Sequence, residues 1–245
     1  QLLVILAYNL FMKIHFQDKT KLVNSVFTKV YKKYDFMNDI MSLGIHRLWK
    51  KNMINWMNPQ KGTRLIDVAS GTGDLAKQFS IKTNNECEIC CVEPNKDMFA
   101  MGEKKLRFFK NIKWHLASAE KLPFKDNSFD FYTISYGIRN VTNITLCLKE
   151  AYRVLKPGGR FMCLEFSKIE NEILEKVYKK YSKIIPLIGK YVAGSAMPYE
   201  YLIESIEKFY DQKALLDLIK KNGFYNVEFR NLSIGISAIH SGWKI

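Results

Sequence analysis

The chain has 245 residues, 47% of them hydrophobic, and a formal net charge of +14 at pH 7. Its length allows one full α/β core but not two large domains, and the lack of any run of eighteen apolar residues excludes a membrane-spanning helix. The lysines are spread along the chain without a tight Lys/Arg block between aromatic residues, so nucleic-acid binding is disfavoured and attraction to an anionic lipid face is favoured.

The first elements in chain order are helical. Residues 1–17 are mostly apolar, contain no Asp or Glu and do not begin with Met. They are interpreted as a leader remnant or a disordered tail. From Lys19 to Met57 the apolar residues recur at helical spacing, which predicts a helical lead-in. We expect 18–245 to form a single domain, in which 18–57 is a helical cap on the substrate side and 168–209 is a helical insertion.

Short apolar strands then alternate with helices. The predicted strands are Arg64–Ala69, Cys87–Val92, Ile112–Leu116, Phe129–Ser135 and Arg160–Phe166, followed by the β-rich stretches Phe224–Asn231 and Ser233–His240. The predicted helices begin at Asp74, after Asn95 as N-cap, at Ile144, at Glu170, at Tyr199 and at Gln212. This alternation indicates a doubly wound, mostly parallel sheet, and the two closing stretches are too near each other for a helical crossover, which indicates an antiparallel pair.

Cysteine usage points to thiols in a reducing compartment. Three of the five cysteines, Cys87, Cys90 and Cys91, are clustered, whereas Cys147 and Cys163 stand alone. A zinc site needs a second pair of ligands, which the chain does not offer nearby. We therefore expect the cluster to be a buried strand in which cysteine acts as a small hydrophobe, and we expect no metal site.

A glycine turn and a carboxylate mark the candidate cofactor site. Gly71-Thr72-Gly73 follows an apolar strand and opens a helix, so backbone N–H groups can approach a ligand closely. Glu93 ends the next strand, where a carboxylate accepts both hydroxyls of a ribose. The pattern Gly71-x-Gly73-x-x-Ala76 also satisfies the dinucleotide fingerprint, so these residues alone leave a nicotinamide cofactor and S-adenosylmethionine equally favoured.

Three further features favour S-adenosylmethionine, because each is similar to a feature of methyltransferases with this fold. Asp67 lies where those enzymes place an acid beside the glycine loop. The loop 117–124 follows the third predicted strand, where they hold the adenine. The segment 153–159, which ends in Lys-Pro-Gly-Gly, precedes the fifth predicted strand. Together, in this order and spacing, they predict a methyltransferase.

The sequence from about Leu22 to Lys244 resembles the ubiquinone/menaquinone biosynthesis C-methyltransferases, the family of the 2-methoxy-6-polyprenyl-1,4-benzoquinol methylases. The resemblance rests on Tyr34–Asn38 with Ser42, His46 and Trp49, on Tyr136–Thr142, on Arg153–Ser167 and on Ala238–Gly242. It implies the class I S-adenosylmethionine methyltransferase fold, which is Rossmann-like, with a mostly parallel seven-stranded sheet and an antiparallel C-terminal strand.

The resemblance also implies site residues. The cofactor contacts that it carries over are Thr72, Glu93, Ser118, Ala119 and Ser135, to which the glycine turn and the acid beside it add Asp67, Gly71 and Gly73. The catalytic candidates are Tyr34, Asp35, His46, Arg139 and Asn140. Arg139 is expected to supply the positive charge that holds a ring oxygen or orients a water, and Asn140 is expected to assist it by a hydrogen bond. His46 or Asp35 is expected to accept the proton. Alternatively, Asp35 caps a helix and His46 is a structural hydrogen-bond donor.

The resemblance implies a polyprenyl quinol substrate and peripheral contact with a membrane. The expected protein partners are other quinone-biosynthesis enzymes and possibly a second copy of the chain, and no binding of nucleic acid is expected. The ubiquinone pathway is favoured, with demethylmenaquinone methylation as the alternative. The expected location is the matrix side of the mitochondrial inner membrane, or alternatively a bacterial cytoplasm. The rival functions are a nicotinamide oxidoreductase, a nucleic-acid methyltransferase, for which the amino-methylating and Pro-Cys motifs are absent from the sequence, and a silent assembly subunit.

Overall fold

The computed structural model describes residues 44–171, 173–176 and 197–245. It also describes ten single residues: Lys19, Lys21, Val23, Ser25, Thr28, Asp39, Ser42, Tyr178, Lys180 and Tyr181. The predicted leader or tail at 1–17 lies outside the described residues, as do the catalytic candidates Tyr34 and Asp35.

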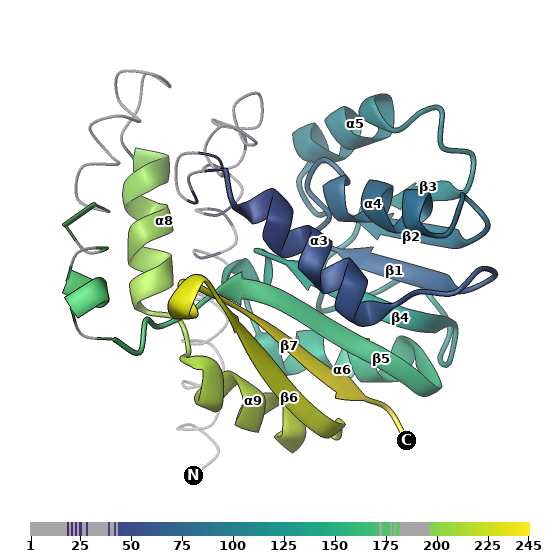
Figure 1. Ribbon diagram of the computed structural model, residues 1–245. Coiled ribbons are helices and arrows are strands. Elements are labelled where there is room, and N and C mark those ends of the chain that lie inside the picture. The colour runs from purple at the N-terminus through teal and green to yellow at the C-terminus, as the bar shows by residue number, and fades with distance from the viewer. Residues whose placement is uncertain are drawn as a thin grey trace, which may run out of the picture.

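A seven-stranded sheet forms the centre of the molecule (Figure 1). Its strands are β1 (Arg64–Val68), β2 (Glu88–Val92), β3 (Ile112–His115), β4 (Phe129–Ser135), β5 (Leu155–Phe166), β6 (Tyr225–Leu232) and β7 (Ser237–Trp243). They lie in the order β3-β2-β1-β4-β5-β7-β6, and β7 runs antiparallel to both of its neighbours. The expected sheet, mostly parallel with an antiparallel C-terminal strand, is confirmed.

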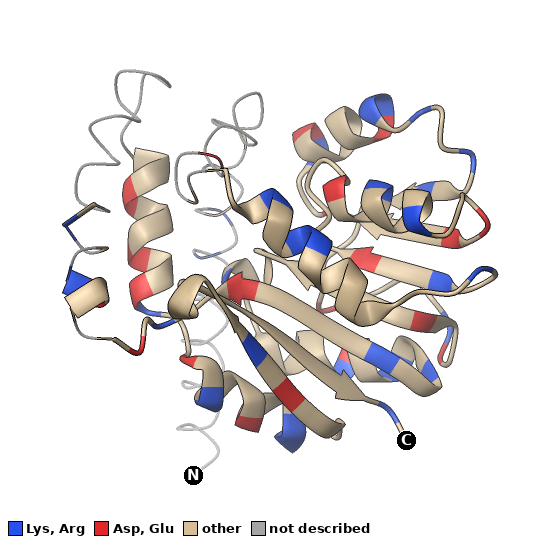
Figure 2. Cartoon of the chain, viewed as in Figure 1, with Lys and Arg blue, Asp and Glu red and all other residues tan. Residues whose placement is uncertain are grey.

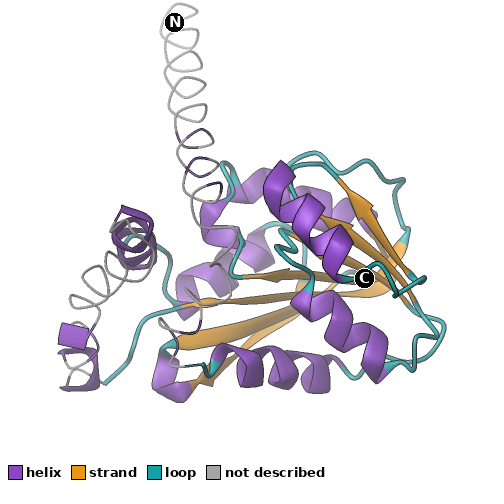
Figure 3. Cartoon of the chain, turned by 90° about the horizontal axis from the view of Figure 1, so that it is seen from above, coloured by secondary structure: helices purple, strands orange, loops and turns teal. Residues whose placement is uncertain are grey.

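Helices pack on both faces of the sheet, as the view from above shows (Figure 3). They are α3 (His46–Met57), α4 (Asp74–Lys82), α5 (Lys96–Lys105), α6 (Ile144–Val154), α8 (Met197–Glu207) and α9 (Gln212–Lys221), with short 3-10 turns η2 (Ile138–Asn140) and η3 (Ser233–Gly235). Alternate residues of β1 enter different cores: Ile66 and Val68 pack with α6 and α9, whereas Leu65 packs with α3, α4 and α8.

Charged residues of both signs alternate over the helices and strands in the view of Figure 2.

Among the described residues, no helix is long and apolar enough to cross a membrane. The described part of the chain also contains no group of three His, Cys, Asp or Glu side chains that could hold a metal ion. Cys90 and Cys91 lie in β2 as free, buried thiols, as predicted, whereas Cys87 precedes the strand and is half-buried. Burial raises the pKa of Cys90 to about 11.

Most strand boundaries lie within one residue of the prediction, but β5 and β7 begin several residues away because long-range contacts set them. β5 begins at Leu155 instead of Arg160, since Leu155 already pairs with Phe129 of β4. The last strand is shifted to Ser237–Trp243, because the left-handed turn η3 occupies the predicted strand start. Lys-Pro-Gly-Gly does follow the end of α6, as expected, but it also forms the first part of β5.

Gly73→Ala is expected to destabilise the protein by about 2–4 kcal/mol. Gly73 has a φ of 81°, and a Cβ there would lie 2.5 Å from Leu106 Cδ1 and 3.0 Å from Trp114 Cζ2. The left-handed backbone costs roughly 1–2 kcal/mol for alanine, and overpacking adds about 1–3 kcal/mol. The matched control is Gly62→Ala, at a φ of 79° with open space around it. Equal losses in urea unfolding for the two variants would contradict the packing contribution.

Candidate functional site

The carboxyl ends of β1, β2 and β4 border a cavity of about 420 Å³, which we call the large cavity. It is lined by Gly71 from the turn after β1, Glu93 after β2, Ser118 and Ala119 after β3, and Asn140 after β4. In doubly wound folds ligands bind at these strand ends. Of the described residues near the N-terminus, Val23 also lines the large cavity, and Asn95 at its edge donates to Thr28 Oγ1 at 3.3 Å.

The turn after β1 is wound tightly enough to bring backbone N–H groups to the cavity. Ala69, Gly71 and Gly73 all have positive φ, at 51°, 58° and 81°. Glu93 is fixed in this arrangement, because its carboxylate accepts from the N–H of Gly71 at 2.9 Å and from the N–H of Asn95 at 3.0 Å. Burial raises the pKa of Glu93 to about 7. The two hydrogen bonds hold the carboxylate of Glu93 at the wall of the large cavity.

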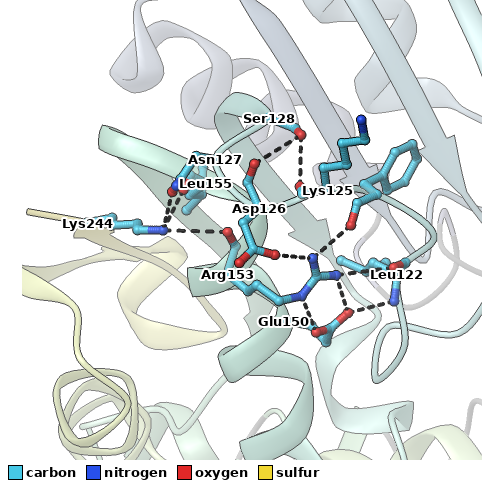
Figure 4. Close-up of polar contacts among 10 residues, drawn as sticks. Leu122, Lys125, Asp126, Asn127, Ser128, Glu150, Arg153, Leu155 and Lys244 are labelled. Carbon is cyan, nitrogen blue, oxygen red and sulfur yellow. Dashed lines mark hydrogen bonds and ion pairs between the residues drawn. The ribbon is translucent and has the colours of Figure 1, made fainter.

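The 117–124 loop is held by Arg153, the first residue of the 153–159 motif (Figure 4). The Arg153 guanidinium donates to Glu150 at 2.6 Å and to the carbonyl of Phe124 at 2.7 Å, while Glu150 accepts from the N–H of Leu122 at 2.7 Å. Hydrogen bonds to Glu150 raise the pKa of Arg153 above its ordinary value. This motif thus acts at a distance, because it positions the loop that carries Ser118 and Ala119.

A second, polar cavity of about 20 Å³ adjoins the large cavity at Ala69, which lines both. The polar side chains around it are those of Lys50, Asp67, Ser70, Thr72, Asp74 and Ser135. Asp67 Oδ1 accepts from Thr133 Oγ1 at 2.7 Å, but Asp67 Oδ2 and Ser135 Oγ have no hydrogen-bond partner within the described residues. Burial raises the pKa of Asp67 to about 7. Buried polar atoms without partners are rare, so these two point to a ligand.

The structure brings seven of the eight expected cofactor residues to these two cavities. Gly71, Glu93, Ser118 and Ala119 line the large cavity, and Asp67, Thr72 and Ser135 line the polar cavity. Gly73 lines neither of them. Its missing side chain instead leaves room for Leu106 and Trp114, so the structure gives it a packing role.

Arg139 is placed differently from the expectation of a cation facing the substrate. Its Nη1 pairs with Glu165 Oε1 and donates to the carbonyl of Tyr136 at 3.1 Å, and its Nε donates to Ser205 Oγ at 3.2 Å. The residue is 8% exposed and lines neither cavity. The physical reason is that a buried guanidinium needs a counter-ion, and Glu165 at the tip of the neighbouring strand supplies it.

The other described catalytic candidates have defined partners. Asn140 lines the large cavity, and its Oδ1 accepts from the hydroxyl of Tyr201 on α8 at 3.0 Å. His46, the first residue of α3, is 1% exposed, with Nε2 at 2.9 Å from Asp39 Oδ1. Its Nδ1 has no partner among the described residues. Burial lowers the pKa of His46, which keeps the imidazole neutral at pH 7.

An apolar cavity of about 350 Å³ lies beside α3, between η3 and the described residues of 169–181. Its lining includes Ile45, Trp49, Leu174, Tyr178, Tyr181, Ile234 and Ile236. Ile234 is 62% exposed and has a φ of 60°, which is strained for a β-branched residue. An exposed isoleucine held in this conformation at a cavity edge suggests a functional surface.

Sequence reasoning missed Lys50 and Tyr201. The available signal for Lys50 was a lysine on the apolar stripe of a helix: it lies four residues after His46 and three before Met53, both buried on α3. For Tyr201 there was no local signal, because its contact with Asn140 spans 61 positions.

Comparisons with known proteins identify relatives of this chain. The model of the ubiE/COQ5 methyltransferase family matches residues 14–244. The ubiquinone/menaquinone biosynthesis C-methyltransferase UbiE of Brucella suis is 48% identical over 241 residues, covering 96% of this chain and 90% of that protein. UbiE of Rickettsia prowazekii is 49% identical over 242 residues, covering 96% and 97%.

A solved structure from Thermotoga maritima shares the fold. It is described as an S-adenosylmethionine-dependent methyltransferase, possibly a histamine N-methyltransferase. Its TM-score is 0.64 at 21% identity, over 91% of this chain and all of that one. At this identity the likeness concerns the arrangement of strands and helices only.

Proposed function

Because the chain belongs to the ubiE/COQ5 methyltransferase family, we propose that it methylates a ring carbon of a polyprenyl benzoquinol in ubiquinone biosynthesis. It is an S-adenosylmethionine-dependent C-methyltransferase, and this excludes the rival function of a nicotinamide oxidoreductase. Methylation of a demethylmenaquinone is the alternative, since the relatives carry both pathways in their name. The finer assignment to ubiquinone follows the sequence resemblance at Ile138 and His240–Gly242.

The observation that carries the proposal is the pair of adjoining cavities at the strand ends. The large cavity has a fixed carboxylate, Glu93, for the ribose hydroxyls, and the polar cavity has unpartnered atoms of Asp67 and Ser135 for an amino-acid end. These residues fit S-adenosylmethionine from adenosine to methionine. When bound, this cofactor supplies an electrophilic methyl group on a sulfonium.

The chain's part in the chemistry is to align the quinol and remove a proton. Deprotonation of a ring hydroxyl makes the neighbouring carbon nucleophilic. His46 is our proton acceptor: its Nε2–H donates to Asp39, which leaves Nδ1 unprotonated. A bound cofactor would supply the methyl group to this carbon, with the electron pair of its carbon–sulfur bond staying on sulfur. Loss of the ring C–H proton to water then restores an aromatic phenolate, which takes the first proton back from His46.

Arg139 and Asn140 act as a unit in this proposal. The ion pair of Arg139 with Glu165 holds the η2 turn, and that turn presents Asn140 to the large cavity. Tyr201 fixes the Asn140 side chain through its oxygen, so the amide N–H₂ group is oriented as a donor. A donor there can stabilise the developing phenolate. Asp35 is the alternative proton acceptor.

We assign the hydrocarbon tail of the substrate to the apolar cavity. Trp49 lines this cavity and contacts Phe166, which in turn packs on Tyr136 of the large cavity, so aromatic rings connect the two. Leu174 and Ile234, which line this cavity, are 38% and 62% exposed. Exposed apolar side chains on the lining of an apolar cavity favour peripheral contact with a membrane, where the tail resides.

The location, the partners and the oligomeric state are further parts of the proposal. The named relatives are bacterial proteins, which favours a bacterial cytoplasm and gives no support to the mitochondrial inner membrane. Other quinone-biosynthesis enzymes and a second copy of the chain are the partners that a lipid-soluble intermediate would favour, because direct transfer keeps it out of water.

The proposed function is tested by incubating the purified chain with S-adenosylmethionine and either 2-methoxy-6-polyprenyl-1,4-benzoquinol or a demethylmenaquinol. Mass spectrometry is expected to show a ring-methylated product, formed faster from the benzoquinol. Preference for the demethylmenaquinol would move the chain to the menaquinone pathway. Absence of product from both quinols, while the cofactor binds, would contradict the proposal and favour a silent assembly subunit.

Replacing Ile234 by Asn is expected to raise the KM for a long-tailed quinol about 5- to 30-fold, the effect of losing roughly 1–2 kcal/mol of apolar contact. The KM for a short-tailed analogue should stay unchanged. Asn tolerates the left-handed conformation that Ile234 adopts, so stability should not fall. The matched control is Tyr225→Asn, at the opposite end of β6 and 57% exposed. A rise in KM for both quinols would count against a tail site.

Cofactor binding is expected to strengthen as pH rises from 6 to about 7.5 and to release protons. Burial raises the pKa values of Asp67 and Glu93 to about 7, so both carboxyls are partly protonated in the free protein. A ligand with a net positive charge favours the ionised forms and lowers these pKa values. Calorimetry in two buffers of different ionisation enthalpy measures the protons released. S-adenosylhomocysteine, without the sulfonium charge, should release fewer, and a buffer-independent enthalpy would refute the coupling.

A further inference from the structure

We infer that Lys50 binds the α-carboxylate of the cofactor's amino-acid end, opposite Asp67, which binds its ammonium group. The eight cofactor residues expected from sequence and resemblance include no Lys, Arg or His. An amino-acid zwitterion needs one anion and one cation, so that set leaves the carboxylate without a counter-charge. The structure places a lysine where the missing charge is required.

Lys50 is a buried lysine whose ion pair is long. It is 7% exposed, on the face of α3 that carries the buried Met53 and Met57. Lysine is almost never fully buried unless paired. Among the described residues its hydrogen bond is with Asp74 Oδ2, at a long 3.4 Å. Asp74 is more closely engaged with Lys105, at 2.7 Å, so one carboxylate serves two ammonium groups.

The opposite charge is available in the same small space. Asp67 lines the polar cavity together with Lys50, is 1% exposed, and has an Oδ2 without a partner within the described residues. If Asp67 binds the ligand's ammonium group, Lys50 keeps only its long contact with Asp74 among the described residues, so its charge is available to the ligand's carboxylate. Thr72, also on this cavity, offers a hydroxyl already bonded to Lys105 at 3.0 Å.

The position along the ligand also fits. Glu93 fixes the ribose in the large cavity, and the polar cavity adjoins that cavity at Ala69. The amino-acid end extends from the ribose through the sulfur, so it reaches the polar cavity when the adenosine is seated. A volume of about 20 Å³ accepts one water-sized polar group, such as a carboxylate oxygen beside Lys50.

The experiment compares the affinities of two ligands by calorimetry: S-adenosylmethionine and its decarboxylated form, which differ only in the carboxylate. The parent protein is expected to prefer S-adenosylmethionine by about 10- to 100-fold, as a charge-assisted hydrogen bond implies. Lys50→Met should remove this preference by weakening S-adenosylmethionine alone, and Lys50→Arg should retain most of it. No quinol is needed, so the result is independent of the proposed substrate.

The matched control is Lys51→Met, which removes an exposed lysine from the next position of α3 and should change neither affinity. Methionine has a similar length and suits a buried helix face, so the fold should tolerate it. Equal weakening of both ligands by Lys50→Met would assign Lys50 to structure and overturn the inference. Equal affinity of the parent for the two ligands would overturn it without any variant.

Discussion

Glu93→Ala is expected to weaken the binding of S-adenosylmethionine by at least about 100-fold. The carboxylate accepts two charge-assisted hydrogen bonds from the ribose hydroxyls in our assignment, each contributing about 1.5–3 kcal/mol. The substitution also removes the acceptor for the N–H groups of Gly71 and Asn95, so the cavity wall loses its fixed shape. Calorimetric titration measures the change, and S-adenosylhomocysteine should weaken by a similar factor because it shares the ribose.

Two variants make this test specific to the carboxylate. Glu93→Asp keeps the charge with a chain one methylene shorter, and it should weaken binding by less than about 10-fold. Glu88→Ala, at the other end of β2, removes a half-exposed carboxylate that pairs with Arg64 and Lys113. It should leave affinity unchanged. A Glu93→Ala protein that is folded and binds the cofactor like the parent would refute the assignment.

Much of the fold could be predicted because its signals are local. β4 and α9 were predicted with the bounds observed, since a buried apolar run and a helical apolar stripe need no distant partner to be recognised. Asn95 caps α5 as expected, through its side-chain oxygen. The boundaries that moved, at Leu155 and Ser237, are set by pairing with strands far along the chain, which no local pattern encodes.

The candidate site divides in the same way. Glu93 and Gly71 could be placed because the carboxyl ends of neighbouring parallel strands meet at one edge of the sheet. Lys50 could not be placed in the site from the sequence, because its burial depends on how α3 packs against α4. Charge arithmetic on the expected contacts would have revealed that a cation was missing, although not which one.

Arg139 shows why a location predicted from sequence does not fix a role. The sequence predicts a cation just after β4, but it gives no measure of whether that charge is already paired there. Glu165 is a carboxylate in the otherwise apolar end of the adjacent strand, β5. Linking the two requires the pairing of β4 with β5, which brings residues 26 positions apart into contact.

Removing Arg139 should therefore affect the fold before it affects the chemistry. Arg139→Ala is expected to lower the free energy of unfolding by about 3–5 kcal/mol, because Glu165, 1% exposed, is left as a buried charge without its partner. Burial raises the pKa of Glu165, and Arg139 opposes that rise. Without Arg139 the pKa of Glu165 rises further, so the loss of stability should be larger at pH 8 than at pH 5.

Urea unfolding at the two pH values measures this loss, and a double variant separates charge from packing. Arg139→Met combined with Glu165→Met should recover most of the stability, since two apolar side chains can replace a buried ion pair. The surface control is Lys208→Ala, whose partner Glu204 is also exposed, and it should cost less than about 1 kcal/mol. If the double variant regains stability but not turnover, the ion pair positions Asn140 for catalysis. Parent-like stability of Arg139→Ala at pH 8 would instead mean that Glu165 is not held as a charge by this arginine.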